Sequence, residues 1–183
     1  MSWKFSFILF IIVIAVIAGC NKKNQEPEKN EKETLQDTKI KEDEHIAPDF
    51  SLFTPDGEKV TLSDYSGKII LLDFWATWCP PCIKSIPDLI SIQNKYKGDL
   101  VVIGISMDHP SLNNDNLLQF IKKHSIDYSV VVGTQKVASD YGDIQAIPTL
   151  FIIDREGRII NEHIGLVPIS TLEKEITAAL KKS

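Results

Sequence analysis

The segment that most restricts the fold is residues 69–82, IILLDFWATWCPPC, in which a nearly unbroken apolar run leads directly into two cysteines. Such a run is typical of a central β-strand that is covered on both faces. Apolar residues then recur at helical spacing, which predicts a helix beginning near Pro80 and Pro81, where proline removes no needed donor. These apolar positions are Ile83, Ile86, Leu89 and Ile90. Cys79 is therefore expected at the N-terminus of a helix that follows a buried strand.

The rest of residues 45–183 alternates between strand-like and helix-like patterns, which predicts a layered α/β fold. A β-hairpin is expected at 49–62, because two short strand-like segments flank the turn sequence TPDG at 54–57. Further strands are predicted at 100–105, 128–132, 149–153 and 158–164. Helices are predicted at 116–124, with Leu117, Leu118 and Ile121 facing inward, at 137–141, and around Leu172, Ile176, Ala179 and Leu180.

The spacing of Cys79 and Cys82 suits a metal clip, a structural staple or a redox pair. A tetrahedral zinc site needs four ligands, and residues 45–183 contain no further cysteine. The histidines stand far apart in the sequence, at His45, His109, His124 and His163. A disulfide that closes a two-residue loop would restrict the unfolded chain very little, so stability is a poor reason for it. We therefore predict a redox pair that needs neither a metal nor another cofactor.

The expected helix assigns different roles to the two thiols. A thiolate attacks a disulfide, whereas a free cysteine with a pKa near 8.5 is only about 3% ionised at pH 7. The helix N-terminus presents unpaired amides and the positive end of the helix dipole, so the Cys79 thiol is expected to ionise more readily. Cys82, one turn later, is close enough to resolve a mixed disulfide. Cys79 is thus the predicted nucleophile and Cys82 the predicted resolving cysteine.

The N-terminus resembles a secretion signal, with one positive charge at Lys4 followed by apolar or small residues at 5–19. Its ending, IAGC at 17–20, resembles the bacterial lipobox, which implies that Cys20 is a lipid anchor; an uncleaved membrane anchor is the alternative. Residues 21–44 contain six lysines and eight acids with few apolar side chains, so we predict a charged flexible tether rather than a stable charged helix. The folded domain is expected at 45–183.

The charge of the expected domain argues against one class of partner. Residues 45–183 carry 13 basic and 17 acidic side chains, without a Lys/Arg cluster or a phosphate-binding glycine loop. A negatively charged domain without a basic patch is a poor ligand for a polyanion. No nucleic acid is therefore expected as a partner.

Several motifs together resemble one family. They are APDF at 47–50, FWATWCPPC at 74–82, Pro87 and IPT at 147–149. From about residue 47 to residue 180 the chain resembles the thioredoxin-fold thiol-disulfide oxidoreductases of the TlpA/ResA-like, membrane-tethered branch. The resemblance implies a central mixed sheet with helices on both faces, an N-terminal β-hairpin, and a helix-bearing insertion between the strands at 100 and 128. Pro87 is expected only to kink its helix.

The resemblance also implies an activity and a location. Such a protein reduces disulfides of extracytoplasmic partner proteins, for example apocytochromes c before haem attachment, and takes electrons from a membrane thiol donor. The peptide bond before Pro148 is expected to be cis and to pack beside the cysteines. Trp78, Pro80, Ile147 and Pro148 are then the expected substrate contacts, although rim packing is an equal role for Trp78.

Asp73 occupies the position of the buried aspartate that helps thioredoxins to deprotonate their second cysteine. ResA-like proteins often carry an acid three residues after that cysteine, where this chain has Ser85. Asp73 is therefore the only acid that the sequence predicts to serve Cys82, with a pKa raised by burial. Asp108 and His109 follow a strand end near the active face, but neither His109 nor His124 is assigned to catalysis.

The cysteine motif also bears on two other functions of this fold. A peroxiredoxin-like thiol peroxidase has a threonine three residues before its reactive cysteine, whereas Thr77 lies two before Cys79. A copper-delivery lipoprotein on the same fold has three residues between its cysteines, whereas this chain has two. Both spacings favour the oxidoreductase.

Overall fold

A buried strand at the centre of a five-stranded sheet organises the fold. The computed structural model describes residues 46–109 and 113–182, so the predicted signal segment, the tether and Cys20 lie outside the described residues. All seven residues of β3 (Ile69–Trp75) are buried, as its apolar run predicts. The strand order is β5-β4-β3-β6-β7, and β3 pairs parallel with β4 and antiparallel with β6. The other strands are β4 (Leu100–Ser106), β5 (Ser129–Val132), β6 (Thr149–Ile153) and β7 (Ile159–Ile164).

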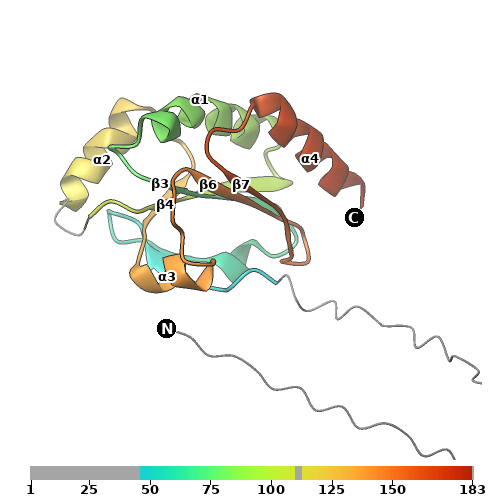
Figure 1. Ribbon diagram of the computed structural model, residues 1–183, viewed down its shortest axis with the longest axis horizontal. Helices are drawn as coiled ribbons and strands as arrows, with labels where there is room; N and C mark the ends of the chain where they lie inside the picture. Colours follow the sequence, from blue (N-terminus) through green and yellow to red (C-terminus); the bar gives the residue numbers. More distant parts are fainter. Residues whose placement is uncertain (1–45, 110–112, 183) are drawn as a thin grey trace, which may run out of the picture. The chain divides into compact units, whose positions relative to one another are not determined.

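Helices cover both faces of this sheet (Figure 1). One face packs against α1 (Pro80–Lys95), α2 (Asn114–Lys123) and α4 (Ile169–Lys181). The other face packs against α3 (Gln135–Asp140), the 3-10 helix η1 (Leu62–Tyr65) and the hairpin of β1 (Ser51–Phe53) and β2 (Lys59–Thr61). Side chains of β3 alternate between the two layers, so a single strand anchors both cores.

The predicted hairpin is confirmed as a separate two-stranded antiparallel sheet. The Thr54 N–H donates to the Glu58 carbonyl at 2.8 Å, and the Gly57 N–H donates to the Thr54 carbonyl at 3.0 Å. Gly57 has a φ of 94°, a conformation that suits glycine because it lacks a Cβ. The turn sequence therefore determined the local structure of this segment.

The predicted fold class is confirmed, and the differences lie at element ends. Helix α2 begins two residues earlier than expected, because Asn113 caps it by accepting a hydrogen bond from the Asp115 N–H at 2.8 Å. Leu118 was wrongly expected to face inward: only Leu117 of this helix is buried, and Leu118 stays outside the core cluster. Helix α2 is the predicted helix-bearing insertion, connecting β4 to its parallel neighbour β5.

Pro87 lies inside α1, and since proline has no N–H it cannot donate to the Ile83 carbonyl, while the helix continues to Lys95. His124 is the residue that caps the C-terminus of α2, where it is half-buried and stacks on Phe120 with ring centroids 4.2 Å apart. Within 46–109 and 113–182, no helix is long and apolar enough to cross a bilayer.

Candidate active site

The two cysteines form a disulfide at the N-terminus of α1. Cys79 is the N-cap residue, and its Sγ accepts a hydrogen bond from the Cys82 N–H at 3.3 Å. Pro80 and Pro81 occupy the first helical positions, where the missing N–H groups are not needed. Both cysteines are almost fully buried, with 3% and 1% exposure. The expected helix start is therefore confirmed, and it places Cys79 as the cap.

The electrostatic environment at this helix end favours an anion on Cys79. The Cys82 N–H, which donates to Cys79 Sγ, and the helix dipole both stabilise negative charge at the N-cap position. The first turn of α1 contains no acidic residue that would oppose it. Once the disulfide is reduced, the pKa of the Cys79 thiol at this position is expected to lie below its ordinary value.

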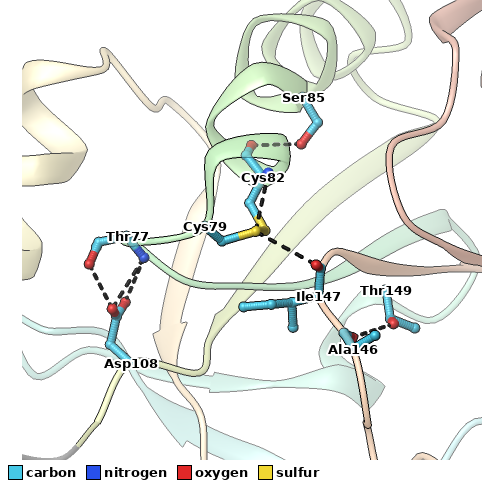
Figure 2. Close-up of a disulfide and its surroundings, with 8 residues drawn as sticks. All are labelled: Thr77, Cys79, Cys82, Ser85, Asp108, Ala146, Ile147 and Thr149. Carbon is cyan, nitrogen blue, oxygen red and sulfur yellow. Dashed lines mark hydrogen bonds between the residues drawn. A yellow bond between two sulfur atoms is a disulfide. The ribbon is translucent and has the colours of Figure 1, made fainter.

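The loop before β6 lies against the disulfide (Figure 2). The Ile147–Pro148 peptide bond is cis, as the resemblance predicts, and the Ile147 carbonyl oxygen lies 3.7 Å from Cys79 Sγ. Thr149 Oγ1 donates to the Ala146 carbonyl at 2.8 Å, and the Gly165 N–H donates to the Pro148 carbonyl at 2.7 Å. These two bonds fix the loop from both ends, so the Ile147 carbonyl faces the sulfur.

An open apolar depression of about 430 Å³ adjoins the disulfide. Its lining residues are Trp78, Met107, Ile144, Gln145, Ala146 and Ile147, which we call the Trp78 groove. Trp78 is 66% exposed, which is unusual for so large an apolar side chain. Among the predicted substrate contacts, Trp78 and Ile147 line the groove, Pro80 is exposed beside it, and Pro148 is buried.

Asp73 lies on β3 and is almost fully buried on the face of the sheet that packs against α1. Burial raises the pKa of its carboxyl from 3.8 to about 7. It lines a cavity of about 10 Å³, roughly the room one water molecule needs, together with Ser85 and Asp88. Asp73 is therefore not the only acid placed here: Asp88, one turn after Ser85, contacts the same cavity. Sequence reasoning missed Asp88 because it considered only the position nearest to Cys82.

Asp108 also belongs to the site, although the sequence motifs assign it no role. Its carboxylate accepts hydrogen bonds from the Thr77 N–H at 3.1 Å, from Thr77 Oγ1 at 2.6 Å and from Ser106 Oγ at 2.8 Å. The available signal was the strand order, because the carboxyl ends of the parallel strands β3 and β4 meet at one edge of the sheet. His109, which follows Asp108, is exposed.

Comparisons with known proteins agree with this geometry. The AhpC/TSA family matches residues 44–162. The thioredoxin-like protein YneN of Bacillus subtilis is 32% identical over 71% of this chain and 76% of its own length. The thiol-disulfide oxidoreductase ResA of Bacillus subtilis is 30% identical over 69% of each chain.

Solved structures show the same fold. A structure described as a thiol:disulfide interchange protein DsbE from Chlorobium tepidum has a TM-score of 0.68 at 34% identity, covering 74% of this chain and 96% of the other. The exposed lipoprotein thioredoxin of Streptococcus pneumoniae has a TM-score of 0.63 at 29% identity, covering 72% and 99%. With a capped cysteine pair beside a cis-proline loop, the chain therefore belongs to the AhpC/TSA family, as a thioredoxin-fold thiol-disulfide oxidoreductase.

Proposed function

We propose that this protein is an extracytoplasmic lipoprotein that reduces disulfides in partner proteins. The observation that carries the reductase assignment is the placement of Cys79 as the cap of α1, facing the Ile147 carbonyl beside an exposed apolar groove. The lipobox-like ending at Cys20 supports a lipid anchor on the outer face of a membrane. A lipoprotein among the structural neighbours supports the same location.

The reaction begins from the dithiol. The Cys79 thiolate attacks one sulfur of a substrate disulfide, the substrate S–S bond breaks, and one substrate cysteine leaves as a thiolate. Cys82 then loses its proton and attacks Cys79 Sγ. The mixed disulfide breaks, and the second substrate cysteine leaves and takes up a proton. Two electrons have passed to the substrate, and the product is the Cys79–Cys82 disulfide seen here. A membrane thiol donor would restore the dithiol.

Asp73 is the proposed acceptor of the Cys82 proton. A carboxyl with a pKa of about 7 is half ionised near neutral pH, which suits proton transfer in both directions. The water-sized cavity shared with Ser85 and Asp88 supplies room for one water beside the Asp73 carboxyl. At 2% exposure, Asp73 is almost completely shielded from bulk solvent.

The Trp78 groove and the cis-proline loop form the proposed substrate surface. An extended substrate segment beside the Ile147 carbonyl would present its sulfur to Cys79, while Trp78 and Pro80 contact neighbouring side chains. The resemblance to ResA-like proteins supports apocytochromes c as substrates, because their haem-binding cysteines must be reduced before haem attachment.

Thiol peroxidase chemistry gains no support from the geometry. Thr77, the threonine nearest before the reactive cysteine, donates its hydroxyl to Asp108. The Thr77 hydroxyl proton is therefore engaged in a hydrogen bond that stabilises the loop before Cys79.

Redox equilibration tests the direction of the reaction. The purified domain is equilibrated in glutathione or dithiothreitol buffers, and the dithiol fraction is measured by alkylation. We expect a potential below about −200 mV, on the reducing side. A potential near that of the strong oxidant DsbA, which is about −120 mV, would overturn the reductase assignment.

The proposed substrate is tested separately. A peptide with two cysteines in the spacing of a haem-binding site, oxidised to its disulfide, is offered to the reduced domain. Reduction faster than that of a scrambled peptide is expected. Equal rates would argue against apocytochrome c while leaving the reductase activity in place.

A further inference from the structure

The turn that delivers the chain to Cys79 is held from outside by one carboxylate. The Cys79 N–H donates to the Ala76 carbonyl at 3.2 Å, so Thr77 and Trp78 occupy the centre of a tight turn. The N–H of the first central residue points away from such a turn. Asp108 accepts that N–H with both carboxylate oxygens, each at 3.1 Å, and accepts the Thr77 hydroxyl as well (Figure 2).

Asp108 is itself anchored in the sheet. Ser106, the last residue of β4, is 2% exposed and donates its hydroxyl to Asp108 at 2.8 Å. The Ser106 carbonyl accepts the Gly133 N–H at 2.8 Å, and the Met107 N–H donates to the Trp75 carbonyl at 2.7 Å. The carboxylate therefore links the turn to the rigid end of two central strands.

The residues next to this contact line the substrate surface. Trp78 directly follows Thr77, and Met107 directly precedes Asp108, and both side chains line the Trp78 groove. The Thr77–Asp108 bonds thus join two walls of one groove. If they were lost, the turn would keep its covalent attachment to α1, but Trp78 would no longer have a fixed position relative to Met107.

We infer that Asp108 is a positioning residue that shapes the Trp78 groove for protein disulfides. Asp108 contacts neither of the two cysteine sulfurs in the structure, so its effect on the groove passes through Thr77 and Trp78. The inference rests on the proposed role of the Trp78 groove as the substrate surface, and it holds for whichever protein is the natural partner.

The test separates groove binding from thiol chemistry. Steady-state reduction of insulin, a generic protein disulfide, is measured with dithiothreitol as the reductant, and the attack of the reduced domain on a small aromatic disulfide is measured alongside. Asp108→Ala removes every hydrogen bond that Asp108 accepts, and it is expected to raise KM for insulin about tenfold with kcat within about twofold. Attack on the small disulfide should stay within about twofold, since it needs no groove.

Two milder variants keep the test informative if Asp108→Ala folds poorly. Asp108→Asn retains one oxygen to accept the Thr77 N–H but cannot accept all three donors. Thr77→Val removes only the hydroxyl bond. Both are expected to raise KM for insulin by a smaller factor than Asp108→Ala, in proportion to the bonds that they remove.

Asp49 offers a matched control. Its carboxylate accepts the Phe50 N–H at 3.0 Å, the Ser63 N–H at 3.1 Å and the Ser63 hydroxyl at 3.0 Å, which is the same kind of contact in the N-terminal segment. Asp49→Asn should lower stability about as much as Asp108→Asn and leave KM unchanged. The inference would be overturned if the Asp108 variants kept a normal KM, or if Asp49→Asn raised KM equally.

Discussion

At the scale of single residues, burial of the Asp73 carboxyl lowers the stability of the fold at neutral pH, and it also gives this group a pKa suited to proton transfer. The strand that buries it is apolar, and burial raises the pKa of its carboxyl to about 7. In the unfolded chain the same group has a pKa of about 3.8. The native state therefore holds this proton over a pH range in which the unfolded chain has released it.

This difference predicts how stability depends on pH. Below pH 3.8 the carboxyl is neutral in both states, and the full native stability is present; as pH rises through about 7, the stability falls by about 4 kcal/mol. Asp73→Asn should abolish this part of the profile. Urea unfolding of wild type and variant at pH 4.5, 6 and 8 measures the difference. A constant difference across these values would show that Asp73 is ionised throughout.

The same variant is expected to slow one chemical step. Without a carboxylate to take the Cys82 proton, resolution of the mixed disulfide should slow by about tenfold or more, while attack by Cys79 changes little. Mixed disulfides should accumulate, and rapid-quench alkylation follows both steps. Asp88→Asn, in the same cavity, is the companion variant: if it slows resolution as much as Asp73→Asn, the two acids act together. An unchanged resolution rate in Asp73→Asn would remove that residue from the mechanism.

At the scale of elements, the site depends on close packing between β3 and β4. Gly104 lies opposite Asp73 in the register of these strands. A Cβ at this position would meet Trp75 Nε1 at 2.8 Å and the Tyr128 ring at 3.3 Å. Trp75 is 1% exposed and packs on Phe120 of α2, so it has little room to move.

Gly104→Ala is therefore expected to destabilise the fold. Overpacking of a core typically costs about 1–3 kcal/mol, and the strain falls on the strand that carries Asp73. The urea midpoint of the variant measures it. A normal midpoint would mean that Trp75 shifts without cost, and then the packing of α2 on the sheet would be looser than its contacts indicate.

At the scale of the whole molecule, the proposed anchor and the folded domain are separable. Cys20→Ala should abolish incorporation of labelled lipid and release or misroute the protein, because the acceptor thiol is gone. The full-length variant should reduce disulfides at the wild-type rate, since Cys20 lies outside the domain at 45–183 that carries the reactive cysteines. Retention of the variant in the membrane fraction would point to an uncleaved helical anchor.

The sequence by itself determined most of the fold and the identity of the reacting pair. The apolar run of β3, the helical spacing after Cys82 and the hairpin turn are local signals, and each is confirmed with small shifts at the ends. Pro80, Pro81 and the apolar spacing that follows predicted Cys79 at a helix N-terminus, which is confirmed. The differences at α2 are local too: Asn113 caps the helix two residues before its predicted start, and Leu118 lies outside the core cluster.

Only the tertiary structure decided what surrounds the cysteines. Asp88 reaches the Asp73 cavity through the packing of α1 on the sheet, and Asp108 reaches Thr77 because two strands 31 residues apart in sequence end at the same edge. The Ile147 carbonyl meets Cys79 across 68 residues of chain. Periodicity and turn chemistry report the conformation of neighbouring residues, whereas these contacts depend on which strands pair and in which register, and sheet topology sets that.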